Sequence, residues 1–338
     1  MNYSQTLTGL IDRHDLSSAQ MRELMENIMN GELTAAQTAA ALVALRMKGE
    51  TVTEIAAAAT VMRERSSKVA VQDNGHLIDT CGTGGDGIQT FNISTASALV
   101  AAAAGARVAK HGGRSVSSTC GSADVLEKLG VNVNLTPQQV AHCVDSIGVG
   151  FMFAPNHHSG MKHAAPVRRE IGVRTLFNLL GPLTNPASAR NQVMGVYRHE
   201  LTGKLAQVLQ QLGSRHVMVV HGLDGMDEIS IGGATHIAEL KDGKVTEYSV
   251  QPADFGLSTR PLETIRVANA EAAKAMLLAV MDNQPGAARD IVCLNAGAAI
   301  YVAGLSMSLA GGVKLAGDTI GSGAARNKLE QLIQASNE

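Results

Sequence analysis

The chain has 338 residues, of which 45% are apolar, and 28 basic and 30 acidic side chains give it a formal net charge of -2. This length is enough for a large buried core and suggests two domains, or one large α/β domain with an appendage. The near-neutral charge, with no basic stripe interleaved with aromatics, argues against a nucleic-acid partner. Charged residues are only 17% and glycines number 35, so many backbone positions are expected in tight turns or against a small ligand.

The first seventy residues have the pattern of consecutive short helices. Thr34 and Gln37 form a capping-box pattern, and Gly49 follows that helix as a stop signal. Thr53 is expected to cap a further helix that runs to about Arg65. A small helical domain is therefore expected at the start of the chain.

Beyond residue 70 strands and helices alternate. Strands are expected at 77–78, 108–109, 150–153 and 217–220, and helices at 94–104, 123–129, from Thr136 onward and at 164–180. The Asp242-Gly243 pair predicts a hairpin near residues 236–250, and a helix-rich tail ends the chain. This alternation predicts a mainly parallel sheet in an α/β domain.

The thiols and the N-terminus indicate the compartment. Cys81, Cys120, Cys143 and Cys293 lack a CxxC spacing and are expected to be reduced. The first residues have neither the basic start nor the apolar run of a signal peptide. The apolar run at 96–106 is too short to span a bilayer. We therefore expect a cytoplasmic protein without a membrane partner.

Three glycine-punctuated, hydroxyl-rich segments lie between residues 79 and 114. They are Cys81-Gly82-Thr83-Gly84-Gly85-Asp86, Asn92-Ile93-Ser94-Thr95 and Lys110-His111-Gly112-Gly113-Arg114. Glycine lets backbone N–H groups approach an anion, and a helix N-terminus favours negative charge. Because each segment follows a strand or opens the helix after it, all three are expected at the carboxyl edge of the sheet. The pattern favours a diphosphate site, with Lys110 and Arg114 as cations, over a set of ordinary capped turns.

The glycine-rich segment is also to be compared with two other phosphate-binding motifs. Residues 82–87 satisfy G-x-G-x-x-G, but no Asp or Glu occurs between Asp86 and Asp124, where a dinucleotide site needs a ribose-binding acid. A Walker loop is excluded because the sequence has no Gly-Lys-Ser or Gly-Lys-Thr. The glycines are therefore expected to bind another anion.

The succession of these segments, with Gly121-Ser122-Ala123-Asp124, Pro166-Val167-Arg168-Arg169 and Gly181-Pro182-Leu183-Thr184-Asn185-Pro186, closely resembles the anthranilate phosphoribosyltransferases over nearly the whole chain. The resemblance implies the fold shared with pyrimidine nucleoside phosphorylases, the class II-like phosphoribosyltransferase fold. It implies a helical domain of residues 1–70 joined by 164–185, and an α/β domain of 71–163 and 186–338. It also implies a homodimer formed through the helical part.

The implied reaction transfers ribosyl phosphate from phosphoribosyl diphosphate to the amine of anthranilate in tryptophan synthesis. An aromatic amine is unprotonated at neutral pH, so no acid or base residue is expected, and Lys110 would stabilise the departing diphosphate. The resemblance implies a phosphoribosyl diphosphate site made of Gly82, Gly85, Asp86, Thr90, Asn92, Ile93, Ser94, Thr95, Lys110, His111, Gly112, Gly113, Arg114, Ser115, Val116, Ser117, Ser118 and Ser122.

The resemblance also implies a Mg²⁺ site and an acceptor site. It assigns Mg²⁺ to Ser94, Asp227 and Glu228, whereas sequence alone favours an ordinary acidic turn there, and Asp224 falls outside the matched pair. It assigns anthranilate to Gly82, Gly113 and Arg168. Arg169 is about 100° away around the same helix, so both arginines are not expected to face one ligand.

This chain differs from the family pattern at two places, and two other functions fit the same fold. Many relatives have Asn where this chain has Gly113, and His157, His158 and His163 match no zinc motif, so a pocket-wall or surface role is expected for them. His111 is expected near the acceptor. The rivals are a pyrimidine nucleoside phosphorylase-like enzyme and a noncatalytic nucleotide-binding protein of the same fold. The second would keep the glycine loop but lose Asp227, Glu228 or Arg168.

Overall fold

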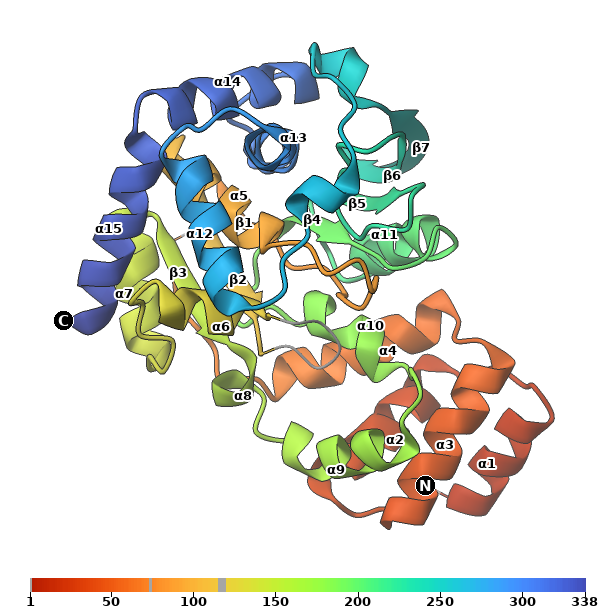
Figure 1. The fold of residues 1–338 in the computed structure, drawn as a ribbon. Helices are drawn as coiled ribbons and strands as arrows, with labels where there is room; N and C mark the ends of the chain where they lie inside the picture. The colour runs from red at the N-terminus through yellow and green to blue at the C-terminus, as the bar shows by residue number, and fades with distance from the viewer. Residues whose placement is uncertain (1, 73–74, 115–119) are drawn as a thin grey trace.

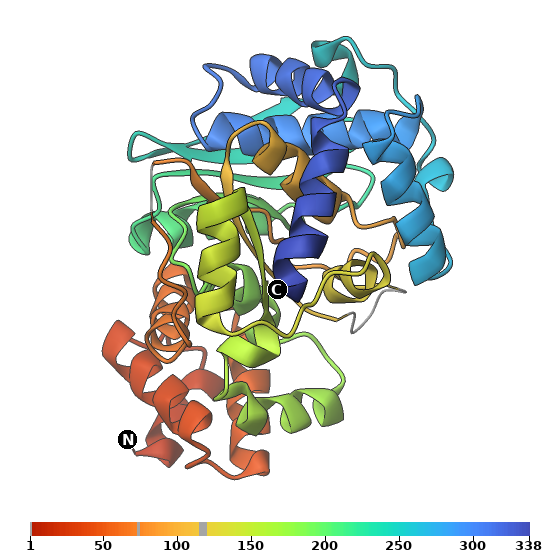
Figure 2. The same cartoon turned by 90° about the vertical axis from the view of Figure 1, so that its left-hand side faces the viewer.

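The computed structural model describes residues 2–72, 75–114 and 120–338. A helical bundle lies beside a larger α/β part, which is built on a seven-stranded sheet in the described portion of the chain (Figure 1). The two parts remain distinct when the molecule is turned, with the bundle at one end (Figure 2). Within the described residues, no helix combines the length and the apolar character needed to cross a bilayer.

The bundle is formed by α1 (Tyr3–Ile11), α2 (Ser18–Asn30), α3 (Ala35–Lys48) and α4 (Val52–Glu64). The capping box of Thr34 and Gln37 and the stop at Gly49 are confirmed. The predicted cap at Thr53 is wrong, because α4 begins after Thr51. The carboxylate of Glu54 accepts the N–H of Thr51 at 2.8 Å, which completes a capping box two residues before Thr53.

The single helix expected over residues 164–180 is wrong. The chain forms α9 (Met161–Ile171) and α10 (Phe177–Leu180), separated by Gly172, whose φ of 68° ends α9 in the left-handed conformation. Helix α9 packs against α2 and α3, and α10 packs against α4. Ala164 and Leu180 are buried in the bundle core. This return of the chain supports a discontinuous helical domain.

The sheet has the strand order β3-β2-β1-β4-β5-β6-β7. Its strands are β1 (Leu77–Asp79), β2 (Arg107–Gly112), β3 (Val149–Phe153), β4 (Asn191–Gly195), β5 (His216–Gly222), β6 (Thr235–Lys241) and β7 (Lys244–Val250). The first five in spatial order are parallel, and β6 and β7 are antiparallel. The hairpin is confirmed, with positive φ angles at Asp242 and Gly243. Strand β4 was not predicted.

The connecting helices confirm the expected alternation. They are α5 (Ile93–Ala103), α6 (Ser122–Lys128), α7 (Pro137–Ile147), α8 (Ala154–His157) and α11 (Leu201–Gln211), with short 3-10 turns at η1 (Gly181–Leu183), η2 (Pro252–Phe255) and η3 (Leu262–Ile265). The helical tail comprises α12 (Ala270–Met281), α13 (Ala287–Val302), α14 (Leu309–Gly321) and α15 (Ala324–Asn337). Thr136 caps α7 with Pro137 at its first position, as predicted.

The two faces of the sheet belong to different cores. Alternate residues Val193, Met218 and Val220 face the core that contains α5 and α13. Their neighbours Met194 and Val219 face a core that contains α11 and continues into the bundle. This period of two lets one sheet join the α/β part to the bundle. The carboxyl ends of the parallel strands are left to carry the loops of the site.

Candidate active site

The glycine-rich loop after β1 lies against the end of β4. The N–H of Thr83 donates to the carbonyl of Gly195 at 2.9 Å. Gly84, Gly85 and Gly87 have φ angles of 65°, 81° and 79°, which side chains rarely adopt. A Cβ on Gly82 would lie 3.0 Å from the Gly195 carbonyl oxygen, so glycine is also needed for close packing. The sequence predicted this loop correctly but not its contact with β4.

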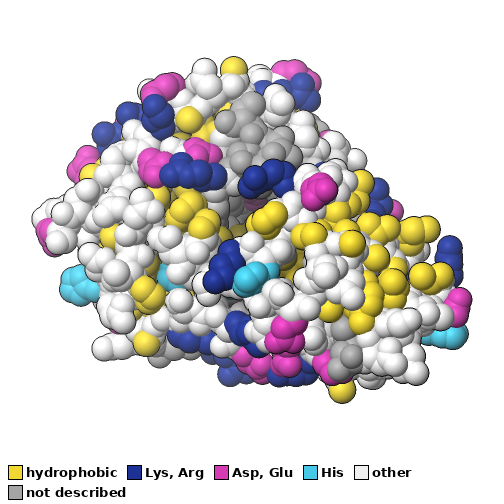
Figure 3. Space-filling view, turned by 90° about the horizontal axis from the view of Figure 1, so that it is seen from below, with side chains coloured by type: hydrophobic (Ala, Val, Ile, Leu, Met, Phe, Trp, Pro, Cys, Tyr) yellow, Lys and Arg dark blue, Asp and Glu magenta, His cyan; other side chains and the backbone are white. Residues whose placement is uncertain are grey.

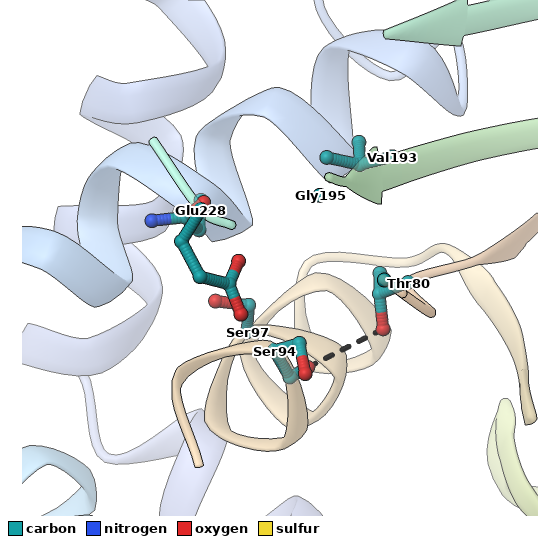
Figure 4. A pocket seen from close by; sticks show the side chains of 8 residues that line it. Thr80, Ser94, Ser97, Val193, Gly195 and Glu228 are labelled. Carbon is teal, nitrogen blue, oxygen red and sulfur yellow. Dashed lines mark hydrogen bonds between the residues drawn. The ribbon is translucent and has the colours of Figure 1, made fainter. Parts of the chain in front are cut away.

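Helix α5 begins at this loop, as expected. Asn92 precedes its first turn, but its amide donates to the carbonyl of Cys120 at 3.1 Å and does not cap the helix. Ser94 in the first turn lines the same small pocket as Glu228, and its backbone lowers the pKa of that carboxyl. Figure 4 shows the Glu228 side chain pointing toward Ser94 and Ser97. The helix N-terminus therefore faces an acidic group.

Lys110 brings a buried cation to the same point. Its Nζ donates to the carbonyl of Thr80 at 2.6 Å and to Oγ of Ser94 at 3.2 Å. Thr80 and Ser94 are joined in turn, because the Thr80 hydroxyl donates to the Ser94 carbonyl at 3.3 Å. Burial raises the pKa of Glu228, and the positive charge of the Lys110 ammonium opposes this by lowering it. Lys110 thus connects β1, β2 and α5 at the predicted anion site.

Asp79 supports this edge from within the sheet. Its carboxylate accepts the N–H of His111 at 3.1 Å and the Asn185 amide at 2.7 Å. Burial raises the pKa of Asp79 to about 6, although these hydrogen bonds and Lys110 oppose the change. Asn185 also donates to the carbonyl of Ala109, so it joins β1 to β2. From the sequence, Asn185 is expected only as part of a family motif, and no role is predicted for Asp79.

Asp227 and Glu228 lie beyond the end of β5, as predicted. Burial is the main cause that raises both pKa values, and neighbouring carboxylates add to it: Asp86 beside Asp227, and Asp227 beside Glu228. The nearby backbone of Gly84 lowers the pKa of Asp227 and partly offsets this effect. A cation bound here would relieve the repulsion between the carboxylates.

Asp224 has a different role in the same turn. Its oxygens accept the N–H of Met226 at 3.3 Å and the hydroxyl of Ser230. These bonds fold the turn between β5 and residue 230. Asp224 therefore maintains the turn.

The predicted metal ligands fit a hard cation that also binds a substrate. Ser94 and Glu228 line one small pocket with Ser97, whose buried Oγ has no hydrogen-bond partner among the described residues (Figure 4). Within the described ranges, no group of three or more His, Cys, Asp or Glu side chains has a metal-binding arrangement. Mg²⁺ is commonly held by one or two carboxylates together with substrate phosphates. The donor set therefore suits Mg²⁺ better than zinc.

The segment after β2 is only partly as expected. A Cβ on Gly112 would overlap Oγ of Ser122, which explains the glycine. Arg114 is expected from the sequence to bind phosphate. In the structure its guanidinium instead pairs with Asp124 at 2.9 Å and Glu127 at 2.6 Å. The predicted residues Ser115, Val116, Ser117 and Ser118 lie outside the described residues.

Arg168 and Arg169 differ as their helical spacing predicts. Arg168 is half-buried on α9, and its guanidinium carbon lies 5.4 Å from the centre of the Phe177 ring. Burial lowers its pKa. Arg169 is exposed. Arg168 is therefore the arginine held in a fixed environment on the side of α9 that faces α10.

His111, His157, His158 and His163 differ in their surroundings. The rings of His111 and His158 lie 5.1 Å apart, and their nitrogens have no hydrogen-bond partner in the described structure. Burial lowers the pKa of His111 to about 3 and that of His158 to about 4, so both are neutral. His157 is buried and contacts the Ser67 carbonyl at 3.0 Å. His163 is exposed and packs against the end of α2.

Arg174 and Asn295 were missed by sequence reasoning. The Arg174 guanidinium lies 4.0 Å from the centre of the Tyr197 ring and donates to the carbonyl of Gly85. It therefore ties the segment between α9 and α10 to the glycine-rich loop. Asn295 on α13 lines the pocket of Glu228. Neither residue lies in a local motif with a recognisable chemistry.

Comparison with known proteins gives the same architecture. Residues 4–66 match the helical bundle domain of a glycosyl transferase family, and residues 74–326 match its a/b domain. The chain is 60% identical to the anthranilate phosphoribosyltransferase of Laribacter hongkongensis over 338 residues, covering 100% of this chain and 99% of that protein. It is 59% identical to that of Nitrosomonas europaea, again covering 100% of this chain and 99% of the relative.

Solved structures agree with these relatives. The anthranilate phosphoribosyltransferase of Thermus thermophilus superposes with a TM-score of 0.93 at 41% identity, covering 98% of this chain and 99% of that one. The Saccharomyces cerevisiae enzyme, in complex with PRPP and Mg, superposes with a TM-score of 0.89 at 26% identity, covering 99% and 98%. The sequence matches and the shared fold place this chain in the anthranilate phosphoribosyltransferase family.

Proposed function

We propose that this chain transfers the 5-phosphoribosyl group from phosphoribosyl diphosphate to the amine of anthranilate, the second step from chorismate to tryptophan. The products are N-(5-phosphoribosyl)anthranilate and diphosphate. One observation carries the proposal: the Lys110 ammonium and the Glu228 carboxylate meet at the N-terminus of α5, and Asp227 lies against the adjoining glycine-rich loop. Membership of the family supports the same reaction.

Phosphoribosyl diphosphate is proposed to bind along the carboxyl edge of the sheet. Gly82, Gly85 and the first turn of α5 would offer backbone N–H groups to its phosphates. Arg114 would have to leave Asp124 and Glu127 before it could contact a phosphate. The other proposed contacts are Asp86, Thr90, Asn92, Ile93, Ser94, Thr95, Lys110, His111, Gly112, Gly113, Ser115, Val116, Ser117, Ser118 and Ser122.

The catalytic contribution of these residues is electrostatic. Departure of diphosphate builds negative charge on the leaving group and positive charge on the ribose carbon that it leaves. Lys110 is held by Thr80 and Ser94, so it needs no reorganisation to stabilise the leaving group. No side chain is proposed to act as nucleophile or base, because the acceptor amine is already unprotonated.

Ser94, Asp227 and Glu228 are proposed to hold Mg²⁺. When bound, the ion would supply positive charge to the diphosphate. The complex of the yeast relative with PRPP and Mg supports this proposal. The clustering of carboxylates in this chain also supports it, because Asp86 beside Asp227 and Asp227 beside Glu228 gather negative charge that a cation would offset.

Anthranilate is proposed to lie between Gly82, Gly113 and Arg168. The Arg168 guanidinium would pair with the acceptor carboxylate. The uncharged rings of His111 and His158 would provide a neutral wall near the acceptor. Among the described residues, nothing lies within 4 Å of a Cβ placed on Gly113, and glycine at this position would contribute backbone only.

The reaction is tested by following anthranilate fluorescence. Adding phosphoribosyl diphosphate and Mg²⁺ is expected to remove the fluorescence in proportion to diphosphate release. Omission of either compound serves as the control. Unchanged fluorescence, together with phosphorolysis of a pyrimidine nucleoside, would contradict the proposal in favour of the phosphorylase-like alternative, which the relatives do not favour.

The proposal includes a homodimer formed by the bundle, in the cytoplasm. Ile11 and Met47 are apolar bundle side chains that are 65% and 71% exposed. Seen from below, hydrophobic side chains gather over the right-hand part of the molecule, where the bundle lies (Figure 3). Such a surface supports association of two copies. The four cysteines are free thiols, as a reducing compartment would keep them.

A further inference from the structure

The turn that carries Asp227 and Glu228 is held from two sides. On one side Gly195 at the end of β4 packs so closely that a Cβ there would overlap the Asp227 carbonyl. On the other side the backbone of Ile229, the next residue after Glu228, contacts Asn295 of α13. The positions of the two carboxylates therefore depend on elements that carry no charge into the site.

Asn295 makes a complete set of hydrogen bonds to backbone groups. Its Oδ1 accepts the N–H of Ile229 at 2.8 Å, and its Nδ2 donates to the Ile229 carbonyl at 2.9 Å. The second hydrogen of Nδ2 goes to the carbonyl of Ile291 at 2.9 Å, one turn earlier in α13. Donors and acceptors on both sides fix the amide orientation and prevent Ile229 from rotating.

The surroundings of Asn295 show that this bond set is specific. Asn295 is 2% exposed, in a helix that is buried along most of its length by apolar residues. Gly297, two residues later, lies against the backbone of Val313, which fixes α13 against α14. A buried amide without partners would be costly in such a core. The amide is tolerated here because the backbone groups of Ile229 and Ile291 pair with it.

We infer that Asn295 is a positioning residue for the metal site, acting through Ile229 on the carboxylates of Asp227 and Glu228. The inference rests on the proposed role of those two acids in binding Mg²⁺. Asn295 lines the same pocket as Glu228 and Ser94 but offers its amide to the backbone. Partners that orient metal ligands in this way typically change metal affinity by about 10–100-fold when they are removed.

The test measures metal binding directly. Mn²⁺ is titrated into the protein in the presence of phosphoribosyl diphosphate, and free Mn²⁺ is followed by electron paramagnetic resonance. Asn295→Leu, which keeps a branched side chain of similar shape, is expected to raise the Mn²⁺ dissociation constant at least tenfold. Its turnover is expected to recover when Mn²⁺ is raised in the same proportion.

A matched variant separates positioning from general loss of stability. Asn191 at the start of β4 is also buried, and its amide donates to the Leu77 carbonyl at 2.9 Å. Asn191→Leu therefore removes a buried amide away from the acidic turn and is expected to leave Mn²⁺ affinity unchanged. Asn295→Ala provides a smaller replacement if the leucine variant does not fold.

The outcomes distinguish this inference from the proposed function. If Asp227→Ala with Glu228→Ala loses Mn²⁺ binding while Asn295→Leu and Asn295→Ala keep wild-type affinity, only the role of Asn295 is overturned. If the double variant itself binds Mn²⁺ with wild-type affinity, the metal site is overturned and the inference fails with it. Weakened binding in the Asn295 variants, with normal binding in Asn191→Leu, supports the inference.

Discussion

At the scale of single residues, the burial of Asp227 and Glu228 makes stability depend on pH. Burial and neighbouring carboxylates raise their pKa values from 3.8 and 4.5 to about 7 and about 8. Between the unfolded and folded values the folded protein binds more protons, so its free energy of unfolding falls as pH rises. In metal-free buffer, Asp227→Asn with Glu228→Gln is expected to lower this dependence, so its Tm declines less than that of wild type between about pH 5 and about pH 8.

Added Mg²⁺ and a third buried acid, Asp79, are the controls for this prediction. Adding Mg²⁺ at the higher pH is expected to raise the Tm of wild type but not of the double variant. Asp79, whose pKa burial raises to about 6, is present in both proteins and accounts for the dependence that remains. Parallel Tm profiles for wild type and variant would contradict the raised pKa values of the acidic pair.

A second residue-scale prediction concerns Arg168. Replacing it with alanine is expected to raise the KM for anthranilate by roughly tenfold or more, because a charged hydrogen bond contributes about 1.5–3 kcal/mol. The KM for phosphoribosyl diphosphate is expected to change much less. Arg169→Ala, an exposed position on the same helix, is the matched control. An unchanged anthranilate KM in Arg168→Ala would exclude the proposed carboxylate contact.

At the scale of elements, β4 connects the glycine-rich loop to the acidic turn. Gly195 accepts from Thr83 and lies against the backbone of Asp227. Gly195→Ala is expected to displace that turn, lowering stability by about 1–3 kcal/mol, as overpacking usually does, and weakening Mg²⁺-dependent turnover. Urea unfolding and activity measure the two effects.

Gly9→Ala is the control for Gly195→Ala. Gly9 lies within α1 with open space around its Cα, so Gly9→Ala is expected to stabilise the protein by up to about 1 kcal/mol through helix propensity. Normal turnover and stability in Gly195→Ala would show that the contact between β4 and the acidic turn has room to relax.

The elements also show what the sequence could and could not predict. The Asp242-Gly243 hairpin and the Thr34 cap are determined by neighbouring residues, so local chemistry predicted them. Strand β4 begins with Asn191 and Gln192, whose amides donate to the Leu77 and Pro182 carbonyls. Because these first residues are polar, the sequence pattern does not indicate a buried strand. The roles of Asn185 and Asn295 depend on partners 106 and 66 residues away, which no local pattern reveals.

At the scale of the whole molecule, the bundle surface carries the prediction of a dimer. Ile11→Asp with Met47→Asp places two charges on the exposed apolar bundle surface and is expected to convert a dimer into a monomer in sedimentation experiments. Met307→Asp, at a side chain that is 96% exposed and lies outside the bundle, is expected to leave the oligomeric state unchanged. A double variant that sediments like wild type would place the interface elsewhere.

The path of the chain between its two parts limits how they can move. The polypeptide leaves the bundle after α4, returns to it between β3 and α9, and leaves again before β4. These three passages are bonded to one another, because Ser67 donates its N–H to the His157 carbonyl at 2.8 Å and Val69 donates to the Pro186 carbonyl at 3.1 Å. Together with the apolar core that the sheet shares with the bundle, they are expected to hold the two parts in one relative orientation.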